Sequence, residues 1–158
     1  THLKGLALKN GNQNLINEIE TTSRLRLGTK SPEITWEKNG NIHSLSDLKA
    51  AENYILIFWS STCSHCVKEI PLLHKELENY SNVTVLTIGL EDDEINWKKE
   101  VANLPNFEHV LALGKWESVY AKLFAINKTP TYFILDSEKR FIFKPDNDKE
   151  LIEFLRSK

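Results

Sequence analysis

The sequence predicts an α/β fold, in which a central mixed sheet carries helices on both faces and an N-terminal β-hairpin precedes it. A continuous apolar run at residues 54–59 is typical of a central strand that is covered on both sides. After this run, segments with strand and helix periodicity alternate, which favours a layered arrangement. The chain has 158 residues, 41% hydrophobic and 27% charged, so one globular domain is expected.

The first part of the chain gives a weaker signal. Residues 12–27 carry a thin apolar stripe among asparagines and predict only a weak helix. We therefore expect residues 1–26 to be a peripheral segment and residues 27–158 to form the domain. The chain contains no methionine and begins at Thr1, so we expect that an upstream segment has been removed. The sequence does not distinguish whether this segment was a signal peptide, a lipid anchor, another domain or a tag boundary.

A hairpin is predicted next. Ile34 and Trp36 alternate with polar neighbours, and Asn39–Gly40 supplies two residues that tolerate a positive φ. Ser44 and Asp47 then have the spacing of a capping box, which predicts the start of a short helix.

The remainder of the chain alternates between strands and helices. We expect strands at residues 54–59, 83–90, 131–135 and 140–144, and helices at residues 64–80, 94–104, 116–124 and after Asn147. The last two strands are separated by a short polar turn, so they form an antiparallel pair at the end of the sheet.

Charge and hydropathy exclude several function classes. The 20 basic and 22 acidic residues are mixed along the chain and give a formal net charge of −2, so neither nucleic acid nor anionic lipid is expected as a partner. The longest apolar run is far shorter than the roughly 20 residues that a membrane-spanning helix needs.

The only two cysteines are Cys63 and Cys66, which follow the predicted central strand directly. Two cysteines are too few for a disulfide scaffold, and a structural zinc site would need four ligands. The remaining interpretations of the two cysteines are a redox pair and an incidental pair.

The position of the pair at the start of a helix favours redox chemistry. Unpaired amides and the helix dipole stabilise a thiolate on Cys63, while Cys66, one turn later on the buried side, can close a disulfide. Cys63 would attack a substrate disulfide and Cys66 would resolve the mixed disulfide. His65 could stabilise the thiolate, or be an exposed loop residue. Glu69 could exchange the proton of Cys66, or be a solvated glutamate of the first turn.

Taken together, these residues resemble a known family, the thioredoxin superfamily, and within it the TlpA/ResA-like extracytoplasmic thiol-disulfide oxidoreductases. The resemblance covers residues from about Leu27 to the end of the chain. The motifs that carry it are Phe58-Trp59, Cys63-Ser64-His65-Cys66, Glu69, Pro71 and Thr129-Pro130-Thr131.

The resemblance implies a thioredoxin-like three-layer sandwich and roles for several residues. Pro130 would be cis and pack beside the cysteines, and Thr129 would offer backbone hydrogen bonds to substrate. Trp59 matches the active-site tryptophan that contributes to substrate binding, Pro71 matches a helix-kinking proline, and Glu69 matches a glutamate that tunes cysteine protonation. Residues 91–114 would hold the elements that distinguish this branch from plain thioredoxin.

The resemblance to TlpA/ResA-like proteins also implies partners and a cellular compartment. Protein disulfides and dithiols would be the substrates, and an upstream thiol-disulfide donor would supply electrons. No bound cofactor is expected beyond the redox-active disulfide Cys63–Cys66. The expected location is periplasmic or otherwise extracytoplasmic, with anchoring through a removed N-terminal segment as an option.

Some residues depart from the family pattern. Plain thioredoxins carry a buried aspartate where this chain has Ile57, so proton transfer must use another group. Thr62 replaces a common tryptophan, and the pair Ser64-His65 is similar to the motif of DsbA and protein disulfide isomerase. We expect a reductase, and an oxidant or isomerase is the alternative.

Three other functions fit less well. A peroxiredoxin would need a threonine where Ser60 stands and a proline before it. A copper(I) module would use Cys63 and Cys66 with His65 or His109. An interaction domain with an incidental cysteine pair would lose nothing on replacement of Cys63.

Overall fold

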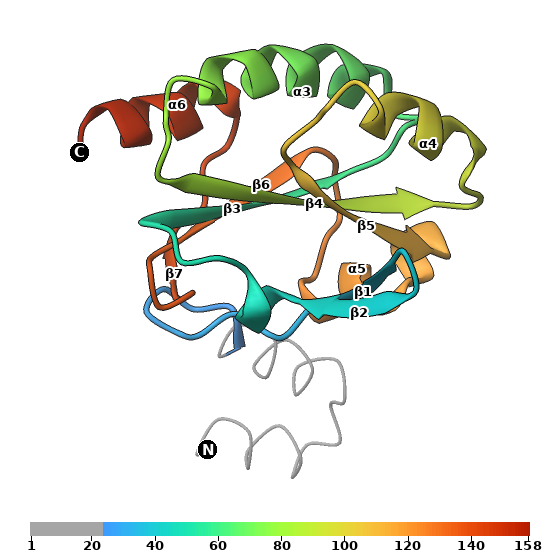
Figure 1. Cartoon of the computed structure of the whole chain (residues 1–158), viewed down its shortest axis with the longest axis horizontal. Helices are drawn as coiled ribbons and strands as arrows, with labels where there is room; N and C mark the ends of the chain where they lie inside the picture. The colour runs from blue at the N-terminus through green and yellow to red at the C-terminus, as the bar shows by residue number, and fades with distance from the viewer. Residues whose placement is uncertain (1–23) are drawn as a thin grey trace, which may run out of the picture.

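The computed structural model describes residues 24–158. The prediction of a weak helix at residues 12–27 and of a peripheral segment at residues 1–26 therefore falls largely outside the described residues. Within the described part, a five-stranded sheet of order β5-β4-β3-β6-β7 separates two layers (Figure 1). The predicted α/β architecture, with a central mixed sheet and an N-terminal hairpin, is confirmed.

The described elements follow each other along the chain with short connections. The hairpin strands are β1 (Thr35–Lys38) and β2 (Asn41–Ser44), and the sheet strands are β3 (Asn53–Trp59), β4 (Val83–Glu91), β5 (Glu108–Leu113), β6 (Thr131–Leu135) and β7 (Phe141–Phe143). The α-helices are α3 (Ser64–Leu77), α4 (Ile95–Val101), α5 (Val119–Leu123) and α6 (Asp148–Arg156), and the 3-10 turns are η1 (Leu45–Asp47) and η2 (Lys115–Glu117).

Strand β3 lies at the centre of the sheet. It pairs in parallel with β4 and antiparallel with β6, and all seven of its residues are buried. Because side chains alternate along a strand, Ile55, Ile57 and Trp59 pack on one face with Cys66, while Tyr54 and Phe58 pack on the other. The continuous apolar run in the sequence thus reflects a strand that is covered on both faces.

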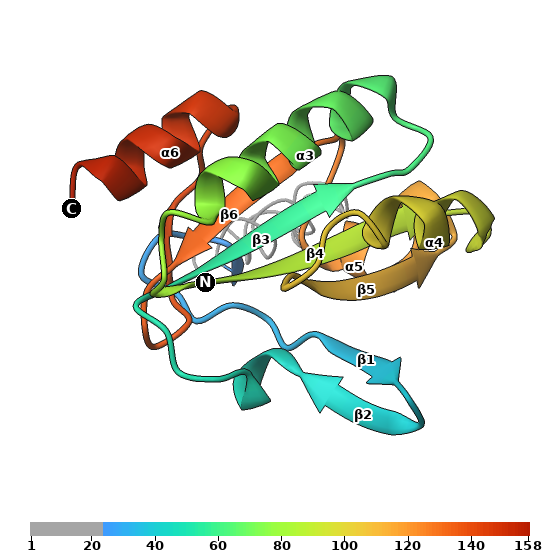
Figure 2. The same cartoon turned by 45° about the horizontal axis from the view of Figure 1, so that its top comes forward.

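One face of the sheet carries α3, α4 and α6. Helices α3 and α6 lie side by side over β3 and β6, and α4 lies over β4 (Figure 2). At Gly89 of β4 a Cβ would lie 2.6 Å from Cδ1 of Trp97, so the absence of a side chain there lets the indole pack onto the strand.

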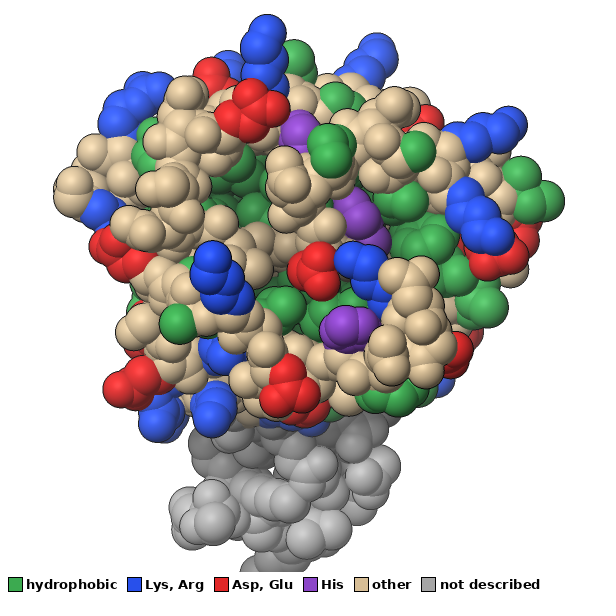
Figure 3. Space-filling model, viewed as in Figure 1, with side chains coloured by type: hydrophobic (Ala, Val, Ile, Leu, Met, Phe, Trp, Pro, Cys, Tyr) green, Lys and Arg blue, Asp and Glu red, His purple; other side chains and the backbone are tan. Residues whose placement is uncertain are grey.

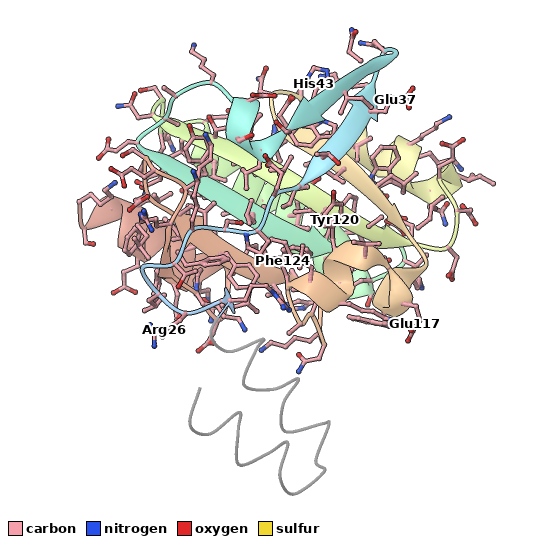
Figure 4. The ribbon with its side chains drawn as sticks, turned by 90° about the horizontal axis from the view of Figure 1, so that it is seen from below. Arg26, Glu37, His43, Glu117, Tyr120 and Phe124 are labelled. Atoms are coloured by element: carbon pink, nitrogen blue, oxygen red, sulfur yellow. The ribbon has the colours of Figure 1, made fainter. Side chains whose placement is uncertain are left out.

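The opposite face carries the hairpin and α5 (Figure 4). Tyr120 of α5 joins the two, since its hydroxyl accepts from the amide of Thr35 at 2.8 Å. Phe124 packs against Phe58 of the central strand with ring centroids 4.9 Å apart. The hairpin turns at Asn39–Gly40 with φ of 54° and 79°, as the sequence predicts.

Three local predictions are corrected by the structure. The element order expected from the sequence lacked β5, an edge strand that pairs only with β4 and whose one β-branched residue is Val110. The helix expected at residues 116–124 is split into η2 and α5, because Ser118 is extended with ψ of 155°. Ser44 caps no backbone amide and instead donates to the carboxylate of Asp47 at 2.7 Å.

Candidate functional site

Cys63 is the N-cap residue of α3, at the carboxyl end of the central strand. Its backbone is extended, and its Sγ accepts from the amide of Cys66 at 3.3 Å. The sulfur therefore takes the place of the oxygen acceptors that usually cap helices, and the free amides and dipole of the helix face it. The predicted helix start at this cysteine is confirmed.

The surroundings of Cys63 favour its thiolate. Burial raises the pKa of this thiol, but hydrogen bonding to the side chains of Cys66 and Thr129 and to the amides of Cys66 and His65 outweighs burial and lowers the pKa below its usual 9.0. The side chain is only half-buried. Cys63 is thus both accessible and biased toward its nucleophilic form.

Cys66 has the opposite character. It is completely buried, and its Sγ lies 2.7 Å from Sγ of Cys63, with both cysteines as free thiols. Burial, followed by the hydrogen bond to Cys63, raises the pKa of the Cys66 thiol to about 12. One sulfur of the pair is exposed to a partner and the other is held behind it as a thiol.

Thr129 and Pro130 border the pair on the side of β6. The peptide bond between them is cis, and the carbonyl oxygen of Thr129 lies 3.8 Å from Sγ of Cys63. This backbone oxygen therefore lies beside the half-buried sulfur. The loop before β6 and the start of α3 therefore form one edge of the site.

Glu69 lies beneath the cysteines on α3 and is 9% exposed. Its Oε1 accepts from the amide of Asp148 at 3.2 Å, which connects α3 to the start of α6. Burial and the side chain of Asp148 raise the pKa of Glu69, although the Asp148 amide and the charge of His65 act against this. The carboxyl group therefore holds its proton to a higher pH than an exposed glutamate does.

His65 and Trp59 occupy different positions from the cysteine sulfurs. The imidazole of His65 is 74% exposed and turns toward Glu69, with Nε2 3.3 Å from Oε2. Trp59 is 1% exposed and packs beneath the site with Cys66. The structure thus places His65 at the rim and Trp59 in the supporting layer.

A sequence model of a family described as thioredoxin-like matches residues 52–141. This match covers more than half of the chain, from the start of the central strand to β7. The chain belongs to the thioredoxin-like family.

Named relatives of this thioredoxin-like chain are thiol-disulfide oxidoreductases. It is 24% identical over 121 residues to ResA of Bacillus thuringiensis (strain Al Hakam), covering 75% of this chain and 69% of ResA. It is 25% identical over 134 residues to ResA of Bacillus cereus (strain ATCC 10987 / NRS 248), and the match covers 82% of this chain and 76% of that ResA. The resemblance to ResA/TlpA-like oxidoreductases is confirmed.

Solved structures agree with this thioredoxin-like assignment. A thioredoxin-like protein from Bacteroides caccae superposes with a TM-score of 0.77 at 20% identity; the alignment covers 98% of this chain but only 60% of that longer one. The thioredoxin domain of a thiol-disulfide oxidoreductase from Bacteroides vulgatus superposes with a TM-score of 0.70 at 27% identity. The alignment covers 84% of this chain and 97% of that domain. The thioredoxin-like fold is confirmed.

One supporting residue of the thioredoxin-like site was not anticipated from the sequence. Glu91, at the end of β4, is 2% exposed and accepts from the amide of Ser61 at 2.7 Å and from the hydroxyls of Ser60 and Ser61. These bonds hold the loop that delivers Cys63. A glutamate at the end of an otherwise uncharged, buried strand is the signal that could have revealed it.

A shallow pocket next to Cys63 was also not anticipated. It is lined by Ser60, Thr62, Cys63, Leu90, Lys115, Trp116 and Thr129. Trp116 is 46% exposed, and Lys115 donates to the hydroxyl of Thr62 at 3.1 Å. The exposed indole of Trp116 thus adds apolar surface beside the accessible sulfur.

The described residues also bear on the metal-binding alternative. Among residues 24–158, no group of three His, Cys, Asp or Glu side chains is arranged to hold a metal ion, and His109 bonds Thr87 and the carbonyl of Leu104. No helix in the described part of the chain is long and apolar enough to cross a bilayer. On the face viewed in Figure 3, acidic and basic side chains are interspersed.

Proposed function

We propose that this thioredoxin-like protein reduces disulfide bonds of protein substrates through Cys63 and Cys66. The observation that carries the proposal is the contrast between the two sulfurs, which lie 2.7 Å apart. Cys63 is accessible with a lowered pKa, and Cys66 is buried with a raised pKa. A nucleophile and a resolving thiol need this division of properties.

The reaction has two exchange steps. The Cys63 thiolate attacks one sulfur of the substrate disulfide, forming a mixed disulfide and releasing the other substrate sulfur as a thiolate. Cys66 then loses its proton to Glu69 and attacks Sγ of Cys63, which closes the Cys63–Cys66 disulfide and releases the second substrate thiolate. The substrate gains two electrons, the protein loses two, and no other cofactor takes part.

The substrate chain is expected to bind across the edge formed by Thr129 and Pro130. The carbonyl of Thr129, 3.8 Å from Sγ of Cys63, is available to accept a hydrogen bond from a substrate amide. The exposed indole of Trp116 offers apolar contact to residues that flank the substrate cysteine. Trp59 supports this surface from below.

The position of His65 supports the reducing direction. A cation beside Cys63 would stabilise its thiolate, and hence the reduced protein, which makes a pair more oxidising. Here the imidazole lies against Glu69 instead. The likeness to ResA/TlpA-like proteins supports a location outside the cytoplasm, where a thiol-disulfide donor would return the pair to its reduced form.

Trapping of the mixed disulfide tests the proposal. Reduced Cys66→Ser is incubated with a disulfide-containing protein such as insulin, and the products are analysed by mass spectrometry without reductant. We expect a covalent adduct on Cys63 that dithiothreitol removes, and no adduct with Cys63→Ser. Equal adducts in both variants, or none in either, would exclude the mechanism.

A further inference from the structure

The resolving step of the proposed function requires a proton acceptor inside the protein. Cys66 is completely buried and has a pKa of about 12, so it is a thiol until a neighbour accepts its proton. Ile57 provides no acceptor from the central strand. Glu69, one turn further along α3, is the acceptor in the proposed mechanism.

Tyr132 faces the same buried layer from β6. It pairs across the sheet with Ile57, so its side chain emerges on the face that holds Cys66. The side chain is fully buried at 0% exposure, yet its hydroxyl has no hydrogen-bond partner among residues 24–158. Buried hydroxyls are normally bonded, so an unpaired one needs a reason.

Glu69 has a matching buried oxygen that accepts no hydrogen bond among the described residues. Its Oε1 is bonded to the amide of Asp148. Its Oε2 lies 3.3 Å from Nε2 of the exposed His65 but accepts no aligned hydrogen bond within the described residues. Burial raises the pKa of Tyr132, and the charges of Glu69 and Asp148, the approach of its hydroxyl to the Glu69 side chain and the charge of Cys66 raise it further. The hydroxyl therefore lies within the field of Glu69 and stays protonated, so it can always donate.

The groups that face Glu69 come from three elements. His65 and Cys66 belong to α3, Asp148 begins α6, and Tyr132 belongs to β6. His65 is exposed to solvent, and the Asp148 carboxylate opposes ionisation of Glu69. The hydroxyl of Tyr132 is thus the buried neutral donor available to Oε2 of Glu69.

We propose that Tyr132 is a positioning residue that donates a hydrogen bond to Glu69 when Glu69 is ionised, which keeps Glu69 able to accept the proton of Cys66. The bond stabilises the carboxylate in a layer where burial penalises its charge. Without the hydroxyl, Glu69 holds its own proton to a higher pH. Resolution of the mixed disulfide then requires a higher pH.

The test follows the resolving step directly. Reduced protein is mixed with oxidised glutathione, the reaction is stopped with acid at set times, and the glutathione adduct on Cys63 is followed by mass spectrometry between pH 5 and pH 10. In Tyr132→Phe we expect the pH midpoint of adduct decay to rise by about one unit. At pH values below the midpoint, the adduct should decay about tenfold more slowly than in the wild type. Adduct formation at Cys63 should be unchanged.

Two further variants separate this role from packing. Tyr54→Phe removes a buried hydroxyl on the opposite face, which bonds the carbonyl of Lys49 at 2.9 Å, and should keep the normal midpoint. In a Glu69→Gln background, Tyr132→Phe should cause no further shift, because the two groups act as a unit. An unchanged midpoint in Tyr132→Phe, or an equal shift in the Glu69→Gln background, overturns the inference.

The wild-type protein provides an independent measurement if Tyr132→Phe does not fold. With tyrosine labelled at Cζ, the carbon resonance of Tyr132 should shift with pH at the midpoint of adduct decay, and a flat titration overturns the inference. The outcome also stays separate from that of the proposed function. A wild-type protein that forms neither a glutathione adduct nor a Cys63–Cys66 disulfide would refute the redox mechanism itself, whereas an adduct that decays normally in Tyr132→Phe refutes only the role of Tyr132.

Discussion

The imidazole of His65 faces Glu69 and not the sulfur of Cys63, although it stands between the two cysteines in the sequence. Its Nε2 lies 3.3 Å from Oε2 of Glu69, four residues further along α3. This arrangement follows from helix geometry, because residues i and i+4 share a face. Within residues 24–158, the hydrogen bonds of the two cysteine sulfurs involve the amide of Cys66, the carbonyl of Thr129 and each other, and none involves the ring of His65.

His65→Gln should therefore leave the reactivity of Cys63 nearly unchanged. The side chain is 74% exposed, and exposed charge pairs contribute little. We expect the pH midpoint of iodoacetamide alkylation at Cys63 to move by less than about 0.3 units. A rise of one unit or more would mean that the imidazole stabilises the thiolate, and His43→Gln on the distant hairpin controls for general loss of a histidine.

Glu91→Gln should loosen the loop that presents Cys63. The variant keeps the shape of the side chain but weakens its bonds to Ser60 and Ser61. Hydrogen bonds to a buried charged group contribute about 1.5–3 kcal/mol. We therefore expect urea unfolding to show a free energy of unfolding that is lower by about that amount. The matched control is Glu94→Gln, whose exposed carboxylate pairs with Lys98 and should cost about 0.5 kcal/mol or less. Equal losses in both variants would contradict the role of Glu91.

Gly89→Ala should destabilise the protein through a direct clash. The new methyl group would lie 2.6 Å from the indole of Trp97, which packs on β4. Overpacking of this kind costs about 1–3 kcal/mol. In a Trp97→Ala background the same substitution should be nearly neutral, and urea unfolding of the four proteins measures the difference. A cost that persists without the indole would place its cause in the strand backbone.

His109 should make stability depend on pH. Its Nε2–H donates to the carbonyl of Leu104 at 3.0 Å, so Nδ1 accepts from the hydroxyl of Thr87 at 2.6 Å. Burial lowers the pKa of His109, and the unfolded chain therefore binds the proton more tightly. The stability from the neutral ring is complete above the unfolded pKa and is lost as the pH falls through the folded pKa.

Urea unfolding between about pH 8 and pH 5 checks this, since the unfolded pKa of histidine is about 6.5. The wild type should lose more stability on acidification than His109→Gln does. Parallel curves for the two proteins would show that His109 titrates alike in the folded and unfolded states.

The sequence predicts the elements whose signals are local. The apolar run of β3, the helix start at Cys63 and the cap at Asn147, whose side chain accepts from the amide of Glu150, can all be read from neighbouring residues. The relation of Glu69 to Cys66 also follows from their spacing on one helix. Such features depend on periodicity and capping alone.

Features that depend on tertiary pairing could not be predicted in this way. β5 is a strand because it hydrogen-bonds to β4, although its residues 111–113, Leu-Ala-Leu, also suit a helix. Tyr132 reaches the site only through its register with Ile57, and Glu91 only through the loop that it holds. The orientation of the His65 ring likewise depends on the position of Glu69 in the folded protein.

The equilibrium reduction potential of the Cys63–Cys66 pair tests the central claim most directly. It is measured by thiol trapping in graded dithiothreitol and glutathione buffers at neutral pH. Thioredoxin has a potential of about −270 mV and DsbA of about −120 mV. A reductase whose His65 contacts Glu69 should have a potential close to the thioredoxin value. A potential near that of DsbA, or failure to form a reversible disulfide, would contradict the account.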